Sequence, residues 1–177
     1  MQKKSTIRLI LAVLLLTFGI TTQAEIKTIK DVLGREVNVD VPVKNAVLGF
    51  YYPDYIAVTG VENFKYVKGI SRELWEKFNP GSWALFSEKI PELKNIADIG
   101  NVNTGTFSTE KTLALKPDVL ILAEWQYQTI GSELPKLEQA GIPIIVVDFN
   151  AQSVERHTQS AKIFGQLAGT EERANKI

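Results

Sequence analysis

Several side chains suited to binding a small molecule follow directly after apolar runs of this sequence. The segment "FYYPDY" follows the run "NAVLG", "SREL" follows "YVKGI", and "EWQY" follows "DVLIL". The candidate binding residues are Phe50, Tyr51, Tyr52, Arg72, Trp75, Trp125 and Tyr127. Aromatic walls with a few polar groups are typical of small-molecule sites, and an arginine can anchor an anion. These residue types predict binding rather than bond-breaking chemistry.

The triplet Phe50, Tyr51 and Tyr52 is the most informative part of this set. Three adjacent aromatic side chains are not expected to point into a core together, and an exposed apolar cluster usually marks a contact surface. A single aromatic such as Tyr55 or Phe149 has an equally good alternative role as a cover for the sheet, because aromatic residues are commonly buried.

The elements that would position these residues form an α/β pattern. Four apolar runs of strand length alternate with segments of helical composition, which predicts a Rossmann-like parallel sheet flanked by helices, with right-handed crossovers. A hairpin centred on Leu33 and Gly34 precedes them, in "IKTIKDVLGREVNVDVP". In parallel sheets ligands bind outside the carboxyl ends of the strands, which is where the aromatic residues fall.

The stretch "STEKTLALKPDVLIL" predicts a helix, a stop and a buried strand. Ser108 or Thr109 can cap the helix, and Glu110 in its first turn suits the positive end of the helix dipole. Lys116 precedes a proline and is pushed out of helical geometry, so the helix ends there. The following run has no polar face, as expected of a strand that is covered on both sides.

The N-terminus has the pattern of a secretory signal peptide. Lys3, Lys4 and Arg8 precede an apolar run at 9–18, and Thr22 and Ala24 occupy the small-residue positions of a cleavage site. The apolar run is short for a bilayer span, so an uncleaved membrane anchor is the less favoured alternative. We expect residues 1–24 to be removed after Ala24 and the mature protein to be exported.

Composition excludes several classes of function. Removal of residues 1–24 takes away three of the 20 basic residues and none of the 20 acidic ones, which leaves 153 residues with a net charge of −3. This balance argues against nucleic acid as a partner. The sequence has no cysteine, so a disulfide scaffold, a zinc–thiolate site and a lipid-anchored N-terminal cysteine are excluded.

Catalysis finds little support in the sequence. His157 is the only histidine, and no acid or nucleophile is placed to work with it. No P-loop, serine elbow or glycine-rich dinucleotide fingerprint is present. We therefore expect no enzyme activity, no resident cofactor and no bare transition-metal site, although tyrosine phenolates are available as ligands for ferric iron.

The last segment, residues 153–177, predicts a helix. Ala161, Phe164 and Ala168 fall on one helical face, and the segment reaches "EERANKI" without a stop signal. We expect residues 25–152 to form one lobe and residues 153–177 to begin a long helix that leaves it.

The order of motifs resembles periplasmic substrate-binding proteins of ABC importers, in the group that serves siderophores, cobalamin, haem and related iron complexes. The matching segments are "DVLGREV", "NAVLGF", "VKGIS", "IADIG", "STEKTLALKPDVLIL", "AGIPIIVVD" and "FGQLAGTEERA". In that family a long helix joins two α/β lobes, and the ligand lies between them. The resemblance implies an N-terminal lobe at 25–152, the start of the interlobe helix at 153–177, and an absent second lobe.

The resemblance also implies a ligand class. An iron complex of siderophore type is the first expectation. Haem-binding relatives tend to have a tyrosine in the loop after the second strand, whereas here that loop carries Trp75 and Trp83. Relatives that handle oxyanions such as molybdate have similarly aromatic first loops, so an oxyanion is the alternative. A stand-alone exported enzyme or binding module of Rossmann-like fold remains the alternative from another class.

Finally, the resemblance implies partners and one docking residue. The protein would be periplasmic, and it would deliver its ligand to a permease in the inner membrane that works with an ATPase. In the family, the acidic residue seven positions before the proline of this motif docks into an arginine-lined pocket of the permease, and Glu110 occupies that position relative to Pro117. The alternative is that Glu110 only complements its helix dipole.

Overall fold

The computed structural model describes residues 24–177, so the signal-peptide prediction lies almost wholly outside the described residues. The described chain begins with the predicted hairpin, in which β1 (Glu25–Lys30) pairs antiparallel with β2 (Glu36–Val41). The buried carboxylate of Asp31 organises the turn, because it accepts hydrogen bonds from the backbone N–H groups of Leu33 and Arg35, each at 3.0 Å.

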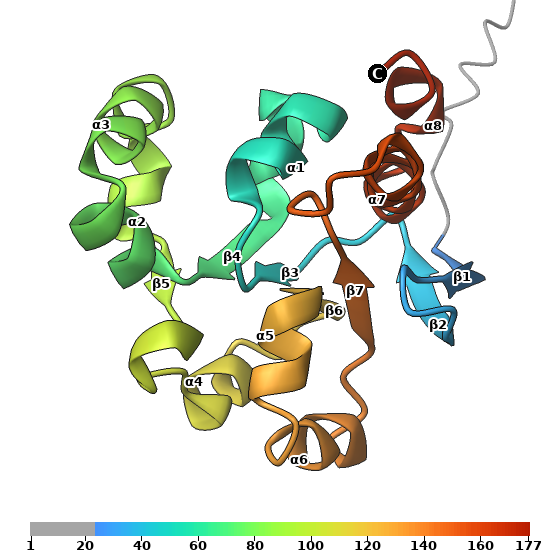
Figure 1. Ribbon diagram of the computed structural model, residues 1–177, viewed down its shortest axis with the longest axis horizontal. Helices are drawn as coiled ribbons and strands as arrows, with labels where there is room; N and C mark the ends of the chain where they lie inside the picture. Colours follow the sequence, from blue (N-terminus) through green and yellow to red (C-terminus); the bar gives the residue numbers. More distant parts are fainter. Residues whose placement is uncertain (1–23) are drawn as a thin grey trace, which may run out of the picture.

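A five-stranded parallel sheet follows, in the order β5-β4-β3-β6-β7 (Figure 1). Its strands are β3 (Ala46–Leu48), β4 (Val67–Ile70), β5 (Ala97–Asp98), β6 (Val119–Ala123) and β7 (Ile144–Val147). Strands β3, β6 and β7 are buried at every position, which explains why their sequences have no polar face. The predicted fold class is therefore confirmed.

Helices cover both faces of this sheet, with α1 and α7 on one side and α4, α5 and α6 on the other (Figure 1). The α-helices are α1 (Tyr52–Thr59), α2 (Arg72–Phe78), α3 (Pro80–Lys89), α4 (Thr109–Ala114), α5 (Glu124–Thr129), α6 (Leu134–Gln139), α7 (Val154–Ala168) and α8 (Glu171–Ala174). Short 3₁₀ helices lie at η1 (Val61–Tyr66), η2 (Pro91–Asn95) and η3 (Val102–Thr104).

The sheet separates two hydrophobic cores, and β6 contributes alternate residues to each. Val119, Ile121 and Ala123 pack into the core that contains α1, α7 and the hairpin. Leu120 and Leu122 pack into the core beneath α5 and α6. This alternation is the period-two pattern of a strand, and it is invisible in the sequence because both faces of the strand are apolar.

The helix, stop and strand predicted for "STEKTLALKPDVLIL" are present as α4, a tight turn and β6. Ser108 caps α4, since its hydroxyl accepts from the backbone N–H of Lys111 at 3.1 Å. The Asn45 amide donates to the carbonyls of Leu115 and Lys116 at 2.7 and 2.8 Å, which holds Lys116 in a left-handed conformation with φ of 48°. The helix end is thus tied to the start of β3.

The predicted C-terminal helix is shorter than expected. Helix α7 ends at Ala168, because Gly169 adopts a left-handed conformation with φ of 70° and its N–H closes the helix onto the carbonyl of Gly165. Helix α8 then starts a new direction at Glu171, whose carboxylate pairs with Lys27 of the hairpin at 2.8 Å. The segment is helical, as predicted, but Gly169 divides it into α7 and α8, and the glycine in "LAGT" is the stop signal that was missed.

Candidate functional site

The direction of the crossover connections reverses between the neighbouring strands β3 and β6. From β3 the chain crosses to β4 on one side, whereas from β6 it crosses to β7 on the other. The segments that leave β3 and β6 therefore diverge at the carboxyl ends of these strands, which is the usual ligand position in open α/β sheets. We call this position the crevice. The residues that follow these strands are Gly49 and Phe50 after β3, and Glu124 and Trp125 after β6.

Three of the predicted aromatic residues meet at this crevice. The Phe50 ring lies edge-on to Trp125 with ring centres 5.7 Å apart, and it lies 5.5 Å from Trp75. Phe50 and Trp125 are each half-buried, so both keep part of their surface in solvent, whereas Trp75 is buried against Phe50 with 8% of its surface exposed. The loop after β3 and the first turns of α2 and α5 thus build one aromatic wall of Phe50, Trp75 and Trp125, although they are far apart in the sequence.

Tyr51 and Tyr52 are buried, which overturns the expectation that the aromatic triplet could not enter the core together. Tyr52 is fully buried against Trp75 and Phe86, with ring centres 4.8 and 5.4 Å away. Tyr51 packs against Phe149, and its hydroxyl lies 3.4 Å from a carboxylate oxygen of Asp148. The cause is the start of α1 at Tyr52, which turns successive side chains to different sides of the helix end.

Burial has an electrostatic consequence for these tyrosines. Desolvation raises the pKa of the Tyr51 phenol well above its usual value, and the nearby Asp148 carboxylate raises it further. Desolvation alone raises the pKa of Tyr52 in the same direction. Both phenols are neutral at physiological pH, so neither offers a phenolate to ferric iron in this arrangement.

Arg72 is engaged with neighbouring backbone instead of standing free in the crevice. Its guanidinium donates to the carbonyl of Lys94 at 3.1 Å, and its Nε lies 3.5 Å from the Glu76 carboxylate. Its backbone N–H donates to Asp98 at 3.0 Å, which joins the end of β4 to the end of β5. The predicted anion anchor is therefore a link between strands in this structure.

Tyr127 points toward the hairpin. The guanidinium of Arg35 donates to the Tyr127 hydroxyl and also holds the buried carboxylate of Asp31. Tyr127 is thus engaged by the hairpin, and its side chain is not part of the contact between Phe50 and Trp125. Of the seven predicted binding residues, the structure brings Phe50, Trp75 and Trp125 together at the crevice.

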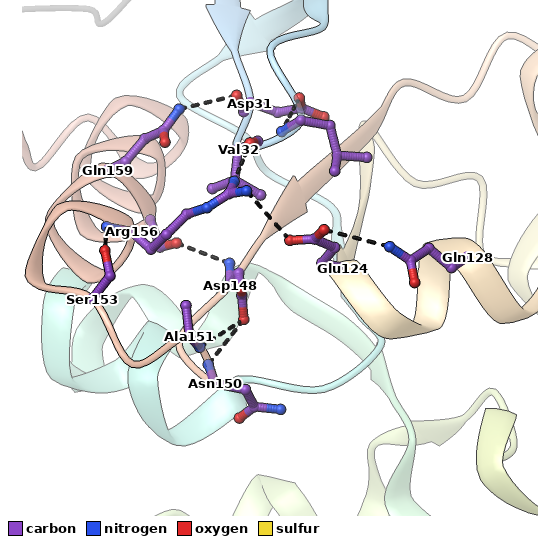
Figure 2. A network of polar contacts seen from close by, with 12 residues as sticks. Asp31, Val32, Glu124, Gln128, Asp148, Asn150, Ala151, Ser153, Arg156 and Gln159 are labelled. Carbon is purple, nitrogen blue, oxygen red and sulfur yellow. Dashed lines mark hydrogen bonds and ion pairs between the residues drawn. The ribbon is translucent and has the colours of Figure 1, made fainter.

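A polar network ties the hairpin and α5 to α7 on the opposite side of the sheet (Figure 2). Arg156 of α7 donates to the carbonyl of Val32, and its guanidinium lies 3.7 Å from the carboxylate of Glu124. Gln159, one turn later, donates to the carbonyl of Asp31 at 3.0 Å. Sequence reasoning missed these residues, because single polar side chains on a helix give no signal of a distant partner.

Gln126 is a second residue that sequence reasoning missed. Its side chain is completely buried between the ends of β3 and β6, where it donates to the carbonyl of Gly49 at 2.9 Å. Its amide oxygen accepts from the backbone N–H of Ala123 at 3.1 Å. A glutamine in "EWQY" is inconspicuous beside its aromatic neighbours, so only the fold reveals its position.

Glu110 lies on the exposed first turn of α4, as predicted. Within residues 24–177 its carboxylate makes no hydrogen bond or ion pair with another side chain. The first turn of α4 follows the carboxyl end of β5, so Glu110 lies toward the same edge of the sheet as the aromatic wall.

Other features of the described chain lie away from the crevice. A groove of about 1110 Å³ runs along the amino-terminal edge of the sheet, between η1, η2 and the end of α4. Over residues 24–177, no three histidine, cysteine, aspartate or glutamate side chains gather as a metal site. None of the helices in that range has the length and apolar character needed to cross a bilayer.

Comparisons with known proteins agree on one class. No family model matches the chain. A curated relative, the uncharacterized ABC transporter substrate-binding lipoprotein YvrC of Bacillus subtilis, is 28% identical over 86 residues, which cover 49% of this chain and 26% of the relative.

Solved structures extend this similarity over most of the chain. The TroA-like periplasmic binding protein FepB of Veillonella parvula is 30% identical, with a TM-score of 0.78 over 86% of this chain and 45% of that protein. The molybdate periplasmic binding protein MolA of Haemophilus influenzae shares the fold, with a TM-score of 0.68 at 18% identity over 85% of this chain and 48% of that one. The chain thus spans about half the length of these structures, and about a quarter of the curated relative is matched.

Proposed function

We propose that this chain, which over the length of one lobe is similar to the TroA-like periplasmic binding proteins of ABC transporters, contributes one wall of the ligand cleft in a substrate-binding component of an ABC importer. Residues 25–152 would form this lobe, and residues 153–177 would begin the connection out of it. The proteins that it resembles are described as binding proteins, which favours binding over catalysis.

The observation that carries this proposal is the aromatic wall at the switch point. Phe50 of the loop after β3, Trp75 of α2 and Trp125 of α5 converge where the chain leaves β3 and β6 in different directions. An aromatic surface that is partly open to solvent, as at Phe50 and Trp125, can cover one side of a ligand and leave the other side for a second surface. Such a wall fits one half of a cleft.

An iron complex with an organic chelator is the ligand class that the wall fits best. Aromatic rings can stack on the planar groups of a chelator, whereas a bare oxyanion needs convergent donors or cations. Arg72, which was expected to supply the cation, already holds neighbouring backbone and the Glu76 carboxylate. The molybdate alternative rests on fold similarity to MolA and is ranked second for this reason.

The remaining parts of the proposal concern location and partner. The leader pattern at 1–24 favours export to the periplasm with cleavage after Ala24, and the N-terminal sequence of the exported protein tests it. The delivery partner would be an inner-membrane permease with its ATPase, with Glu110 as the docking residue.

Titration of tryptophan fluorescence tests ligand binding directly. Ferric tris-catecholate, ferric hydroxamate, haemin and molybdate would each be added to the protein, and we expect quenching by a ferric chelate. Trp125→Ala should weaken that binding about tenfold or more, because it removes a central aromatic contact. Trp83→Phe, at a half-buried position of helix α3 outside the ring contacts of Phe50 with Trp75 and Trp125, is the matched control and should bind normally. Binding of molybdate alone would favour the oxyanion, and no binding of any probe would contradict the proposal.

A further inference from the structure

The ends of β3 and β6 are separated by a side chain where a backbone hydrogen bond is expected. In the register of this parallel pair Leu48 lies opposite Ile121, and the N–H of Gly49 donates to the carbonyl of Ile121 at 2.8 Å. A regular ladder would next join the N–H of Ala123 to the carbonyl of Gly49. Both of those groups bind the amide of Gln126 instead, at 3.1 and 2.9 Å.

We propose that Gln126 is a positioning residue that acts as a wedge, holding the ends of β3 and β6 apart and thereby setting the width of the crevice. A carboxamide satisfies both backbone groups at once, since its oxygen accepts and its nitrogen donates. It therefore replaces one rung of the ladder by a bridge of two hydrogen bonds, without leaving a buried polar group unpaired. The strands are separated at the point where their loops diverge.

The residue opposite the wedge is a glycine for a spatial reason. A Cβ on Gly49 would lie 2.4 Å from the amide oxygen of Gln126 and 2.8 Å from a methyl carbon of Leu122. Both separations are far below van der Waals contact, so any larger residue would displace the amide. Gly49 and Gln126 therefore form a matched pair across the crevice floor.

The wedge controls the aromatic wall because its two anchors immediately precede that wall. Gly49 is followed by Phe50, and Ala123 is followed within two residues by Trp125. The spacing of the two anchors fixes where the rings of Phe50 and Trp125 meet, 5.7 Å apart and nearly perpendicular. This inference rests on the proposed function only for the meaning of the crevice, because the wedge itself is defined by backbone geometry.

Gln126→Glu gives a test with a pH signature. A protonated carboxyl can accept from Ala123 and donate to Gly49 as the amide does, whereas a carboxylate has no proton to donate. Burial raises the pKa of such a carboxyl, so protonation should occur in the mildly acidic range. We expect the near-ultraviolet circular dichroism of this variant to differ from wild type at about pH 8 and to return at about pH 5.

Three further variants complete the test. Gln126→Met fills the same space without either hydrogen bond, so its near-ultraviolet spectrum should differ from that of the wild type at both pH values. Gln128→Glu adds the same charge on the exposed side of α5 and should match wild type throughout. Each variant is also made in a Trp125→Phe background, and the difference between the two near-ultraviolet spectra isolates the contribution of Trp125. Far-ultraviolet circular dichroism spectra show whether a variant is unfolded.

Gln126→Ala removes the wedge altogether and separates positioning from simple stabilisation. Its crystal structure should show the N–H of Ala123 bonded directly to the carbonyl of Gly49 at about 2.9 Å, with the rings of Phe50 and Trp125 moved. The proposal would be overturned if the backbone N–H of Ala123 and the carbonyl of Gly49 stayed apart in that structure. It would also be overturned if the near-ultraviolet spectrum of Gln126→Glu did not change with pH.

A binding measurement then distinguishes this inference from the proposed function. With ferric tris-catecholate at about pH 8, Gln126→Glu should bind about tenfold more weakly than Gln128→Glu. If the wild-type protein binds none of the probes, the proposed function fails while the spectra and the Gln126→Ala structure still decide the role of the wedge. Equal affinity of the two variants would show that the wedge does not shape the cleft.

Discussion

The guanidinium of Arg35 donates a hydrogen bond to the hydroxyl of Tyr127 at 2.9 Å and lies 4.3 Å from the centre of its ring. The same guanidinium contacts the fully buried carboxylate of Asp31 at 2.7 Å and the carbonyl of Ile144 at 2.9 Å. One side chain therefore joins the turn of the hairpin, helix α5 and the start of β7.

Loss of Arg35 should destabilise the whole fold. Arg35→Met keeps much of the apolar volume but leaves the Asp31 carboxylate buried without its cation, which typically costs about 3–5 kcal/mol. Tyr127→Phe removes only one hydrogen bond and should cost about 1 kcal/mol. Urea unfolding of both variants measures the two losses in the free energy of unfolding. Equal losses would show that the buried carboxylate of Asp31 does not depend on Arg35.

The link between Asn45 and the end of α4 should also be measurable. Asn45→Ala removes the donors to the carbonyls of Leu115 and Lys116, and we expect a loss of about 2 kcal/mol. Asp118→Ala should have a similar effect, because its carboxylate accepts from the backbone N–H groups of Lys44 and Asn45. Asp40→Ala, at an exposed position of the hairpin, is the control and should change stability by less than about 0.5 kcal/mol.

The tyrosines should ionise in a defined order. Lys44 and Lys65 lie over the ring of Tyr66 and lower the pKa of its exposed phenol, so Tyr66 should titrate first. Burial raises the pKa of Tyr51, Tyr52 and Tyr55. Tyrosinate absorbance followed with rising pH checks this order, and Tyr66→Phe should remove the earliest step.

The same shifts predict how stability depends on pH. A phenol whose pKa is higher in the folded state contributes stability that is complete below its unfolded pKa of about 10 and is lost as the pH rises through the folded value. Urea midpoints should therefore fall above about pH 10, and Tyr51→Phe should weaken that fall. A midpoint that stays constant into strong alkali would contradict the burial of these phenols.

Glu110 can be tested with a chimaera in which residues 25–177 replace the matching lobe of a two-lobed relative that has a known permease. Glu110→Arg should abolish transport while ligand affinity and melting temperature stay unchanged, because an exposed first-turn acid is structurally dispensable. Glu138→Arg reverses another exposed charge, on helix α6, and should transport normally. Normal transport by Glu110→Arg would leave only the dipole role.

Local patterns were sufficient to predict the hairpin, the parallel sheet and the turn at Lys116. Alternation, strand-length apolar runs and a Lys-Pro pair act within a few residues, so the sequence displays them directly. The end of α7 was missed although Gly169 marks it, because the helical face of Phe164 and Ala168 was extended past the glycine.

The site was predicted less completely, for a physical reason. Sequence position indicates which residues follow a strand, but it does not show which way a helix start turns them. Tyr52 comes only two residues after Phe50, yet it is fully buried while Phe50 keeps a solvent-facing surface. Gln126 acquires its role only when β3 and β6 pair, because its partner Gly49 lies 77 residues earlier in the sequence.

The central place of β3 governs the order in which the chain can fold as it is made. Strand β3 ends at Leu48, but its partner β6 begins only at Val119. The edge of β3 that pairs with β6 therefore stays unpaired until β6 has been synthesised. Such distant pairing is slow compared with local crossovers such as that from β6 to β7. During synthesis, the bare edge of β3 is therefore open to wrong pairing, and a chaperone that recognises extended apolar segments would protect it.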